Sequence, residues 1–497
     1  MSESFQGTVI RGALAHLLTS TPAKLLGFAL TILAAQTLSP GLYGEFNLAV
    51  TIYGISDLLT NPSVFTYFVR TPEAPEKSLN SAFTFSLVRG VILMGIFWLL
   101  ATPLAAAFDG GPGVVVLLQL LSTTFFIASV RNPWVVSVYH GLEYRKMALI
   151  ESVGALVGNI AGIVLLLIYE NPAALATGVI VNQIVGCILT WVYADRAPKF
   201  AFDVKELVTV WNFSRFLLIN NIIIFLLLQL DDVFIAKLAG LELLGIYALA
   251  FKVANDSVLF LIATLRQVLL PAFVRLVSDR EKLARATLRA VGTLSALSWI
   301  LASATFAIAH ELMLIISPDP EWRGSELVLM ALMPFVLVRA VNGVYGSVLV
   351  AVGEPQVLSR VAGFQLACMI PLMWLGYEVG LGIRGSEMDG VLGVTLAIAI
   401  LNLLTNNVLM VHCHREHDIP GWKGFGLMWL LAPVCVPAAG LATWLKDPTW
   451  NPWFGATVGA LIVLLIALPA WELLVRGLKL GELVDSPSKL IQRAISR

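Results

Sequence analysis

Fourteen apolar stretches follow one another along the chain and constrain its fold more than any other feature. A helix of about 20 apolar residues crosses the hydrocarbon layer of a membrane. Charged residues make up 13% of the chain, against roughly 25% in soluble domains. The sequence therefore predicts an all-α integral membrane protein with about fourteen transmembrane helices. Their approximate ranges are 10–37, 41–62, 81–105, 112–136, 146–168, 173–195, 208–237, 243–270, 286–316, 326–352, 356–378, 390–412, 423–445 and 453–475.

Basic residues are distributed unevenly among the connections between these segments. The odd-numbered connections hold Arg323, Arg384 and Lys446, with Lys237 at a helix end. Cytoplasmic connections of membrane proteins are enriched in Lys and Arg, so the N- and C-termini are predicted to be cytoplasmic. The even-numbered connections and the tail hold Arg70, Lys77, Arg145, Lys146, Arg196, Lys199, Lys205, Arg275, Arg280, Lys282, Arg285, Arg415, Lys423, Arg476, Lys479, Lys489, Arg493 and Arg497.

A short repeat indicates how the helices are grouped. The stretch LAAQTLSPGLYGEFNLAV (33–50) matches part of LLLQLDDVFIAKLAGLELLGIYALAFKVANDS (226–257) when Gly44 is placed on Gly245. Parallel repeats of this kind are a transporter architecture. We expect two parallel six-helix halves, 1–200 and 201–415, followed by helices 13 and 14 with a tail in 416–497.

Basic residues also lie inside the apolar segments, where a charge costs at least ~2.5–3.5 kcal/mol. Lys24, Lys252 and Arg339 lie deepest, so we expect them to line a cationic central cavity. Arginine can bind two phosphate oxygens through its planar fork, whereas lysine acts as a point charge. Other candidates lie closer to the cytoplasmic ends, where snorkelling to the headgroups is the alternative explanation. They are Arg11, Arg89, Arg215 and Arg360.

Acidic residues in these segments allow two interpretations. Asp57, Asp232 and Asp256 either pair with the basic residues or carry a proton or cation that couples transport to a gradient. Asp256 follows Lys252 by four residues, a spacing at which the two side chains lie on one helix face and can neutralise each other. Charge pairing is the interpretation that we favour for each.

Other functional classes find little support in the sequence. It contains neither a phosphate-binding G-x-x-x-x-G-K-[ST] loop nor a nucleophile–base constellation, so we expect neither an enzyme nor a cofactor. Cys187, Cys368, Cys413 and Cys435 are scattered and are expected to be small buried residues. The run HCHREH (412–417) contains metal-binding residue types, but it lies where a cytoplasmic helix end should be basic, and we expect no metal there.

Four stretches carry a resemblance to a known family: LSPGLYGEFNLA (38–49), LEYRKMALIES (142–152), LDDVFIAKLAGLELLGIYALA (230–250) and VLLPAFVRLVSDREKLARA (268–286). With the helix count, they make the chain to about residue 290 resemble the Wzx-type lipid-linked oligosaccharide flippases of the polysaccharide transporter family. Within this resemblance Asp232 matches an acidic position in the seventh helix, and Tyr247 an aromatic one after the outer turn.

The resemblance implies transport of undecaprenyl-diphosphate-linked oligosaccharide repeat units across the bacterial inner membrane. The product would be a surface polysaccharide such as lipopolysaccharide O-antigen or exopolysaccharide. Its implied partners are membrane lipid and the polysaccharide polymerase and chain-length proteins, without nucleic acid. We expect alternating access around the central cavity, with helices 13 and 14 lining the path of the lipid tail.

Three alternatives remain open. A cation-coupled multidrug exporter of the sister family would need a cavity with net acidic charge. A membrane-embedded glycosyltransferase or polymerase would need a large outer loop with catalytic residues, and the odd-numbered connections are short. A facilitator-type transporter would carry a Gly-Asp-Arg signature after helix 2, which the loop NPSVFTYFVRTPEAPEKS (61–78) lacks.

Overall fold

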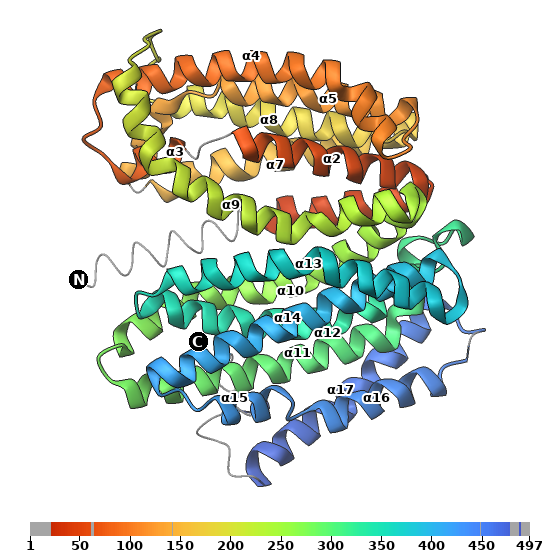
Figure 1. Ribbon diagram of the computed structural model, residues 1–497. Coiled ribbons are helices and arrows are strands. Elements are labelled where there is room, and N and C mark those ends of the chain that lie inside the picture. Colours follow the sequence, from red (N-terminus) through yellow and green to blue (C-terminus); the bar gives the residue numbers. More distant parts are fainter. Residues whose placement is uncertain (1–20, 61–63, 142, 448, 478–486, 489–497) are drawn as a thin grey trace. The chain divides into compact units, whose positions relative to one another are not determined.

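The computed structural model describes residues 21–60, 64–141, 143–447, 449–477 and 487–488, and these residues form helices joined by short connections without any β-strand (Figure 1). Eleven helical stretches of the described residues are long and apolar enough to cross a membrane. The predicted class, an all-α multi-pass membrane protein, is therefore confirmed. The chain forms two compact units, Met1–Gly245 and Ile246–Arg497. The three-part division predicted from the helix count stays a prediction.

The first unit is a bundle in which α4 packs on α5, α7 on α8 and α5 on α8, while α2 packs on α5 and α9. Residues 21–37 are helical as well, and two short helices, α3 and α6, lie in the connections. The helices of this unit are α2 (Pro40–Thr60), α3 (Val64–Arg70), α4 (Glu76–Ala107), α5 (Pro112–Ser129), α6 (Val136–His140), α7 (Tyr144–Tyr169), α8 (Ala173–Tyr193) and α9 (Val204–Leu238).

The second unit repeats this packing. Here α11 packs on α12, α13 on α14 and α12 on α14, and α11 also contacts α15, α16 and α17. The helices are α10 (Gly240–Leu276), which begins in the last residues of the first unit, α11 (Arg280–Ile316), α12 (Ser325–Ala351), α13 (Pro355–Arg384), α14 (Glu387–His417), α15 (Gly421–Met428), α16 (Ala432–Leu445) and α17 (Pro452–Gly477).

Each predicted apolar segment overlaps a helix, but two boundaries were wrong. The segment predicted at 112–136 ends at Ser129, because proline follows Asn132 and the chain turns into a short 3-10 helix. The segment predicted at 423–445 is interrupted between α15 and α16 at residues 429–431. The count of fourteen crossings stays a prediction, since residues 10–20 of the first segment lie outside the described residues.

Polar caps and glycines fix several helix ends. The side chain of Asp203 accepts hydrogen bonds from the first turn of α9, and Asp279 does the same for α11, as residues at the N-cap position commonly do. Gly353 and Gly385 have φ of 87° and 77°, a left-handed conformation that glycine adopts without steric cost. These two glycines therefore permit the abrupt turns before α13 and after it.

The two repeat-related glycines meet within the first unit. A Cβ atom added to Gly44 would lie 1.9 Å from the carbonyl oxygen of Leu241, and one added to Gly245 would lie 1.9 Å from that of Pro40. The contact is reciprocal, because Pro40 and Leu241 are related by the same sequence offset as the two glycines. Only glycine fits at position 44 or at position 245, because a side chain at either would collide with the backbone of the other segment.

A buried ion pair attaches the last helices to the second unit. Lys446, at the end of α16, places its Nζ 2.5 Å from Oε2 of Glu311 on α11. The two side chains are only 7% and 13% exposed, and Nζ also donates to the carbonyl oxygen of Ala307. Breaking a buried pair by removing one partner costs about 3–5 kcal/mol. The pair therefore holds α16 firmly against α11.

Candidate functional site

A polar cavity of about 660 Å³ lies inside the first unit, among α2, α4, α5, α7 and α8 and the short α3 and α6. Its charged residues are two arginines and two acids, in a region that consists of apolar membrane helices. The polar lining residues are Tyr53, Asp57, Ser86, Arg89, Ser129, Arg131, Asn132, Tyr139, Glu151, Asn182, Gln183 and Thr190.

Arg131 is positioned by the break at the end of α5. Its Nη2 donates to Oε1 of Gln183 on α8 at 2.6 Å. Gly186, one turn further along α8, leaves room for the guanidinium, since a Cβ there would lie 3.1 Å from Nη2. The next residue, Asn132, donates its backbone N–H to Oγ1 of Thr190 at 3.0 Å. The irregular backbone after α5 is thus anchored to α8, and the arginine projects into the cavity.

Asp57 of α2 and Arg89 of α4 lie in the same cavity. The carboxylate of Asp57 interacts electrostatically with both Arg89 and Arg131. On the opposite wall, Oη of Tyr139 donates to Oε1 of Glu151 at 3.3 Å. The two arginines therefore have acidic neighbours, and they also present donors that an anionic group entering the cavity can bind. A planar guanidinium suits the oxygens of a phosphate.

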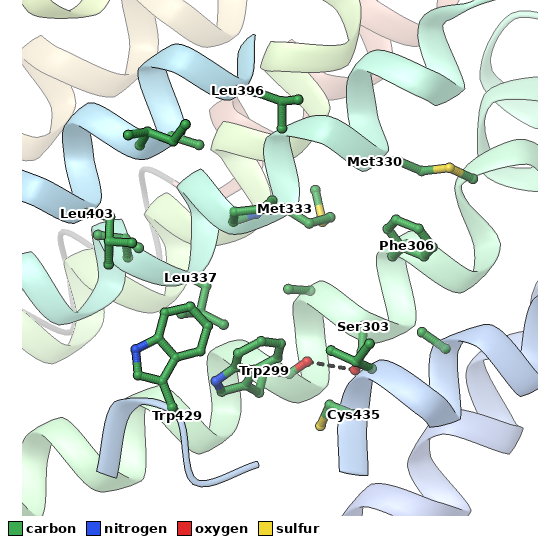
Figure 2. A pocket seen from close by; sticks show the side chains of 17 residues that line it. Trp299, Ser303, Phe306, Met330, Met333, Leu337, Leu396, Leu403, Trp429 and Cys435 are labelled. Atoms are coloured by element: carbon green, nitrogen blue, oxygen red, sulfur yellow. Dashed lines mark hydrogen bonds between the residues drawn. The ribbon is translucent and has the colours of Figure 1, made fainter. Parts of the chain in front are cut away.

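The second unit encloses a cavity of different chemistry, about 370 Å³ in volume and lined by α11, α12, α14 and α16 with Trp429 (Figure 2). The indole rings of Trp299 and Trp429 pack together with centroids 5.6 Å apart. Nε1 of Trp299 donates to the carbonyl oxygen of Met428, and Oγ of Ser303 to that of Trp299. Because these polar groups bond to the backbone, the walls present mainly hydrocarbon and sulfur. Such a cavity suits an apolar ligand.

Ten candidate residues were predicted, and nine of them are described by the structure; of these nine, Asp57 and Arg89 line the polar cavity. Asp232 is buried and accepts a hydrogen bond from Oγ1 of Thr51 at 3.2 Å. Lys252 and Asp256 form an ion pair of 2.8 Å, as their spacing indicated.

The remaining basic candidates lie elsewhere. Arg339, on α12 of the second unit, places its Cζ 5.3 Å from the centre of the Phe335 ring. Lys24 and Arg215 belong to the first unit and are exposed. Arg11 lies outside the described residues. Whether these side chains bind a substrate stays a prediction.

Sequence reasoning missed Arg131, Gln183 and Tyr139. Arg131 fell inside a predicted apolar segment and was not singled out among the basic residues. The signal that could have found it is its position directly before Asn132-Pro133, where a helix must end. Gln183 carried no comparable signal, because a lone amide in an apolar helix points to no particular partner.

Known proteins with similar sequences include proteins of polysaccharide biosynthesis. Residues 33–323 match the family described as polysaccharide biosynthesis protein. The lipopolysaccharide biosynthesis protein WzxC of Escherichia coli K12 is 21% identical over 431 residues, which are 85% of each chain.

Solved structures show the same fold. The lipid II flippase MurJ in an inward closed conformation matches 94% of this chain and 99% of its own, with a TM-score of 0.73 and 14% identity. An inward-facing multidrug resistance transporter of the MATE family matches 80% of this chain and 98% of its own, with a TM-score of 0.61 and 14% identity. Both likenesses concern the fold.

Proposed function

The chain belongs to the polysaccharide biosynthesis protein family, and from this membership we propose that it is a flippase for lipid-linked oligosaccharides. The substrate is an undecaprenyl-diphosphate-linked repeat unit that moves from the cytoplasmic to the outer leaflet of the bacterial inner membrane by alternating access. Its product feeds the assembly of a surface polysaccharide, by a polymerase and chain-length proteins that receive the exported unit. Transport of this kind needs no catalytic residue.

The observation that carries the proposal is the pair of arginines in the polar cavity. Charges inside a membrane protein mark the path of a polar or ionic substrate. Without substrate, Asp57 is an acidic neighbour of both guanidinium groups; a diphosphate entering the cavity replaces it. Tyr53 and Tyr139 add the aromatic and hydroxyl groups that suit sugar rings.

The apolar cavity of the second unit supports the proposal that the substrate carries a lipid tail. A polyprenyl chain needs a hydrocarbon surface while its diphosphate is in a polar environment. The Met330, Met333 and Phe306 side chains line that cavity (Figure 2), as does Cys435 of α16. We propose that α16 and α17, the thirteenth and fourteenth predicted crossings, help to hold the lipid tail.

We further propose roles for the charged residues outside the polar cavity. Lys24, Arg215, Lys252 and Arg339, together with Arg11, are candidates for binding the diphosphate during other stages of the cycle. Asp57, Asp232 and Asp256 are candidates for charge pairing or ion coupling. The 2.8 Å contact between Lys252 and Asp256 supports pairing for Asp256.

The alternative function is a cation-coupled multidrug exporter, the class to which the MATE structure belongs. The polar cavity holds Asp57 and Glu151 beside Arg89 and Arg131, so it lacks the net acidic charge that a cationic drug requires. The arginines therefore favour the anionic lipid.

Transport in proteoliposomes tests the proposal. We expect the purified protein to translocate an undecaprenyl-diphosphate-linked oligosaccharide, but neither the same glycan on a lipid without the diphosphate nor a cationic dye. Export of the dye without translocation of the lipid would support the multidrug alternative instead.

The proposed orientation has its own test. Single cysteines that replace Lys77, Lys199 or Lys282 should react with membrane-impermeant reagents from the cytoplasmic side only. Cysteines that replace Arg323 or Arg384 should react from the outside. Labelling of the first group from the outside would overturn the assignment of cytoplasmic termini.

A further inference from the structure

Two histidines and a glutamate that line neither cavity converge at one end of the second unit. His412 and His417 lie in the last two turns of α14, and Glu354 lies in the turn between α12 and α13. One carboxylate oxygen, Oε2 of Glu354, is 2.9 Å from Nε2 of His412 and 3.3 Å from Nε2 of His417. All three donor atoms lie within 4.8 Å of one another.

We propose that His412, His417 and Glu354 form a binding site for a divalent transition metal, with Zn²⁺ as the preferred ion. Two histidines and one glutamate are an established zinc donor set, in which water completes the fourth position. This site was not expected from the sequence, since Glu354 is 58 residues away from His412 along the chain. The proposed metal site does not depend on the proposed flippase function.

The geometry is close to what the ion requires. Zinc binds imidazole nitrogen at about 2.0–2.1 Å and carboxylate oxygen at about 2.0–2.2 Å, so a tetrahedral site places its donors roughly 3.4 Å apart. The two nitrogen–oxygen distances, 2.9 and 3.3 Å, are both slightly shorter than this separation. Small side-chain rotations that move the rings off the shared oxygen are enough to admit the ion.

The contacts and burial of the three groups also suit a metal. The two imidazole nitrogens face the same carboxylate oxygen of Glu354. Nε2 of His417 is buried, and Oε2 of Glu354 lies 3.3 Å from it. The side chains of His412 and Glu354 are 29% and 32% exposed, which leaves access for an ion and for a water ligand.

A bound ion would join helix ends that are connected only by side chains in this region. It would link the α12–α13 turn, which Gly353 allows, to the end of α14. Directly after α14, Asp418 forms an ion pair of 2.8 Å with Arg280 at the start of α11. The metal would therefore hold the start of α13 against the end of α14, and raise the thermal midpoint of the full chain.

Metal binding by the purified full-length protein, with any polyhistidine tag removed, tests the proposal. We expect about one Zn²⁺ per chain, and Co²⁺ in its place should give the strong visible absorption of tetrahedral coordination. His412→Ala and His417→Ala should each weaken binding by at least the ~10–100-fold that loss of an outer-shell partner costs. Glu354→Gln keeps an oxygen that can accept the imidazole hydrogen bonds, so it should fold normally and still bind weakly.

Two other histidines provide matched controls. His414 lies on the same helix end, but its Nδ1 bonds to the carbonyl oxygen of Ile419, and His310 lies exposed on α11. His414→Ala and His310→Ala should leave zinc affinity and the zinc-dependent rise in thermal midpoint unchanged. Equal zinc affinity in the wild type and the His412→Ala/His417→Ala double variant would overturn the proposal. So would Glu354→Gln protein that is folded and binds zinc as tightly as the wild type.

Discussion

The two units pack their helices alike but enclose cavities of opposite chemistry. Packing of α4, α5 and α8 in the first unit corresponds to that of α11, α12 and α14 in the second. Between the first set lie Arg89 and Arg131 with their acidic neighbours, whereas between the second set lie Trp299, Met333 and other apolar side chains. Two units with similar helix packing can therefore hold cavities of different chemistry.

In the second unit α16 and α17 pack on α11, and removing the ion pair that anchors α16 should have the largest effect. Lys446→Ala leaves Glu311 buried without its partner, so we expect a loss of about 3–5 kcal/mol in stability. Unfolding of the purified protein by a denaturing detergent measures this loss. The double variant Lys446→Met/Glu311→Leu should recover most of it, because no uncompensated charge remains. Equal stability of Lys446→Ala and the wild type would show that the ion pair does not hold α16.

Removing the positive charge from the polar cavity should have the next largest effect. Arg131→Ala takes away the partner of Gln183 and a neighbour of Asp57. The contact between Arg131 and Gln183 is solvent-accessible, and losing a hydrogen bond to a charged group costs about 1.5–3 kcal/mol, so the initial rate of lipid translocation should fall ~10-fold or more. Arg285→Ala is the matched control, because that arginine is half-exposed and pairs with Glu281 on the helix surface. An unchanged rate in Arg131→Ala would remove the cavity from the transport path.

Filling the apolar cavity of the second unit should change the stability of the protein and its transport rate in opposite directions. Ala399 is buried and lines the cavity, and cavity-filling substitutions commonly add about 0.5–2 kcal/mol. Ala399→Leu should therefore raise the stability slightly while slowing translocation of the polyprenyl substrate. Val436→Leu changes a largely exposed lining residue and should alter both quantities less. Faster transport in Ala399→Leu would contradict a lipid-binding role.

The smallest expected effect comes from a substitution in the first unit that keeps the positive charge of an arginine but changes its hydrogen-bonding geometry. Arg89→Lys keeps the positive charge but loses the planar fork that binds two oxygens. We expect only a several-fold decrease in the translocation rate, equivalent to about 1 kcal/mol. The rate of Arg89→Ala should be lower than that of Arg89→Lys. If the two variants are equally slow, geometry matters more than charge; if Arg89→Lys matches the wild type, charge alone suffices.

The sequence by itself determined the membrane class, the positions of the helices and the family. These follow from local properties: a run of apolar residues long enough to span a bilayer, and breakers such as Asn132-Pro133 that end it. Local spacing also found the Lys252–Asp256 pair, because four residues on a helix always place two side chains on one face.

Only the tertiary structure decided which side chains meet across helices. Arg131 reaches Gln183, 52 residues further along, and Glu354 reaches His412 and His417. In a soluble protein a polar stripe would mark the outer face of each helix, but lipid tails are as apolar as a protein interior. The rotation of each helix about its axis is therefore not written in its hydrophobic pattern, and the cavities and the metal site became visible only once the helices were packed.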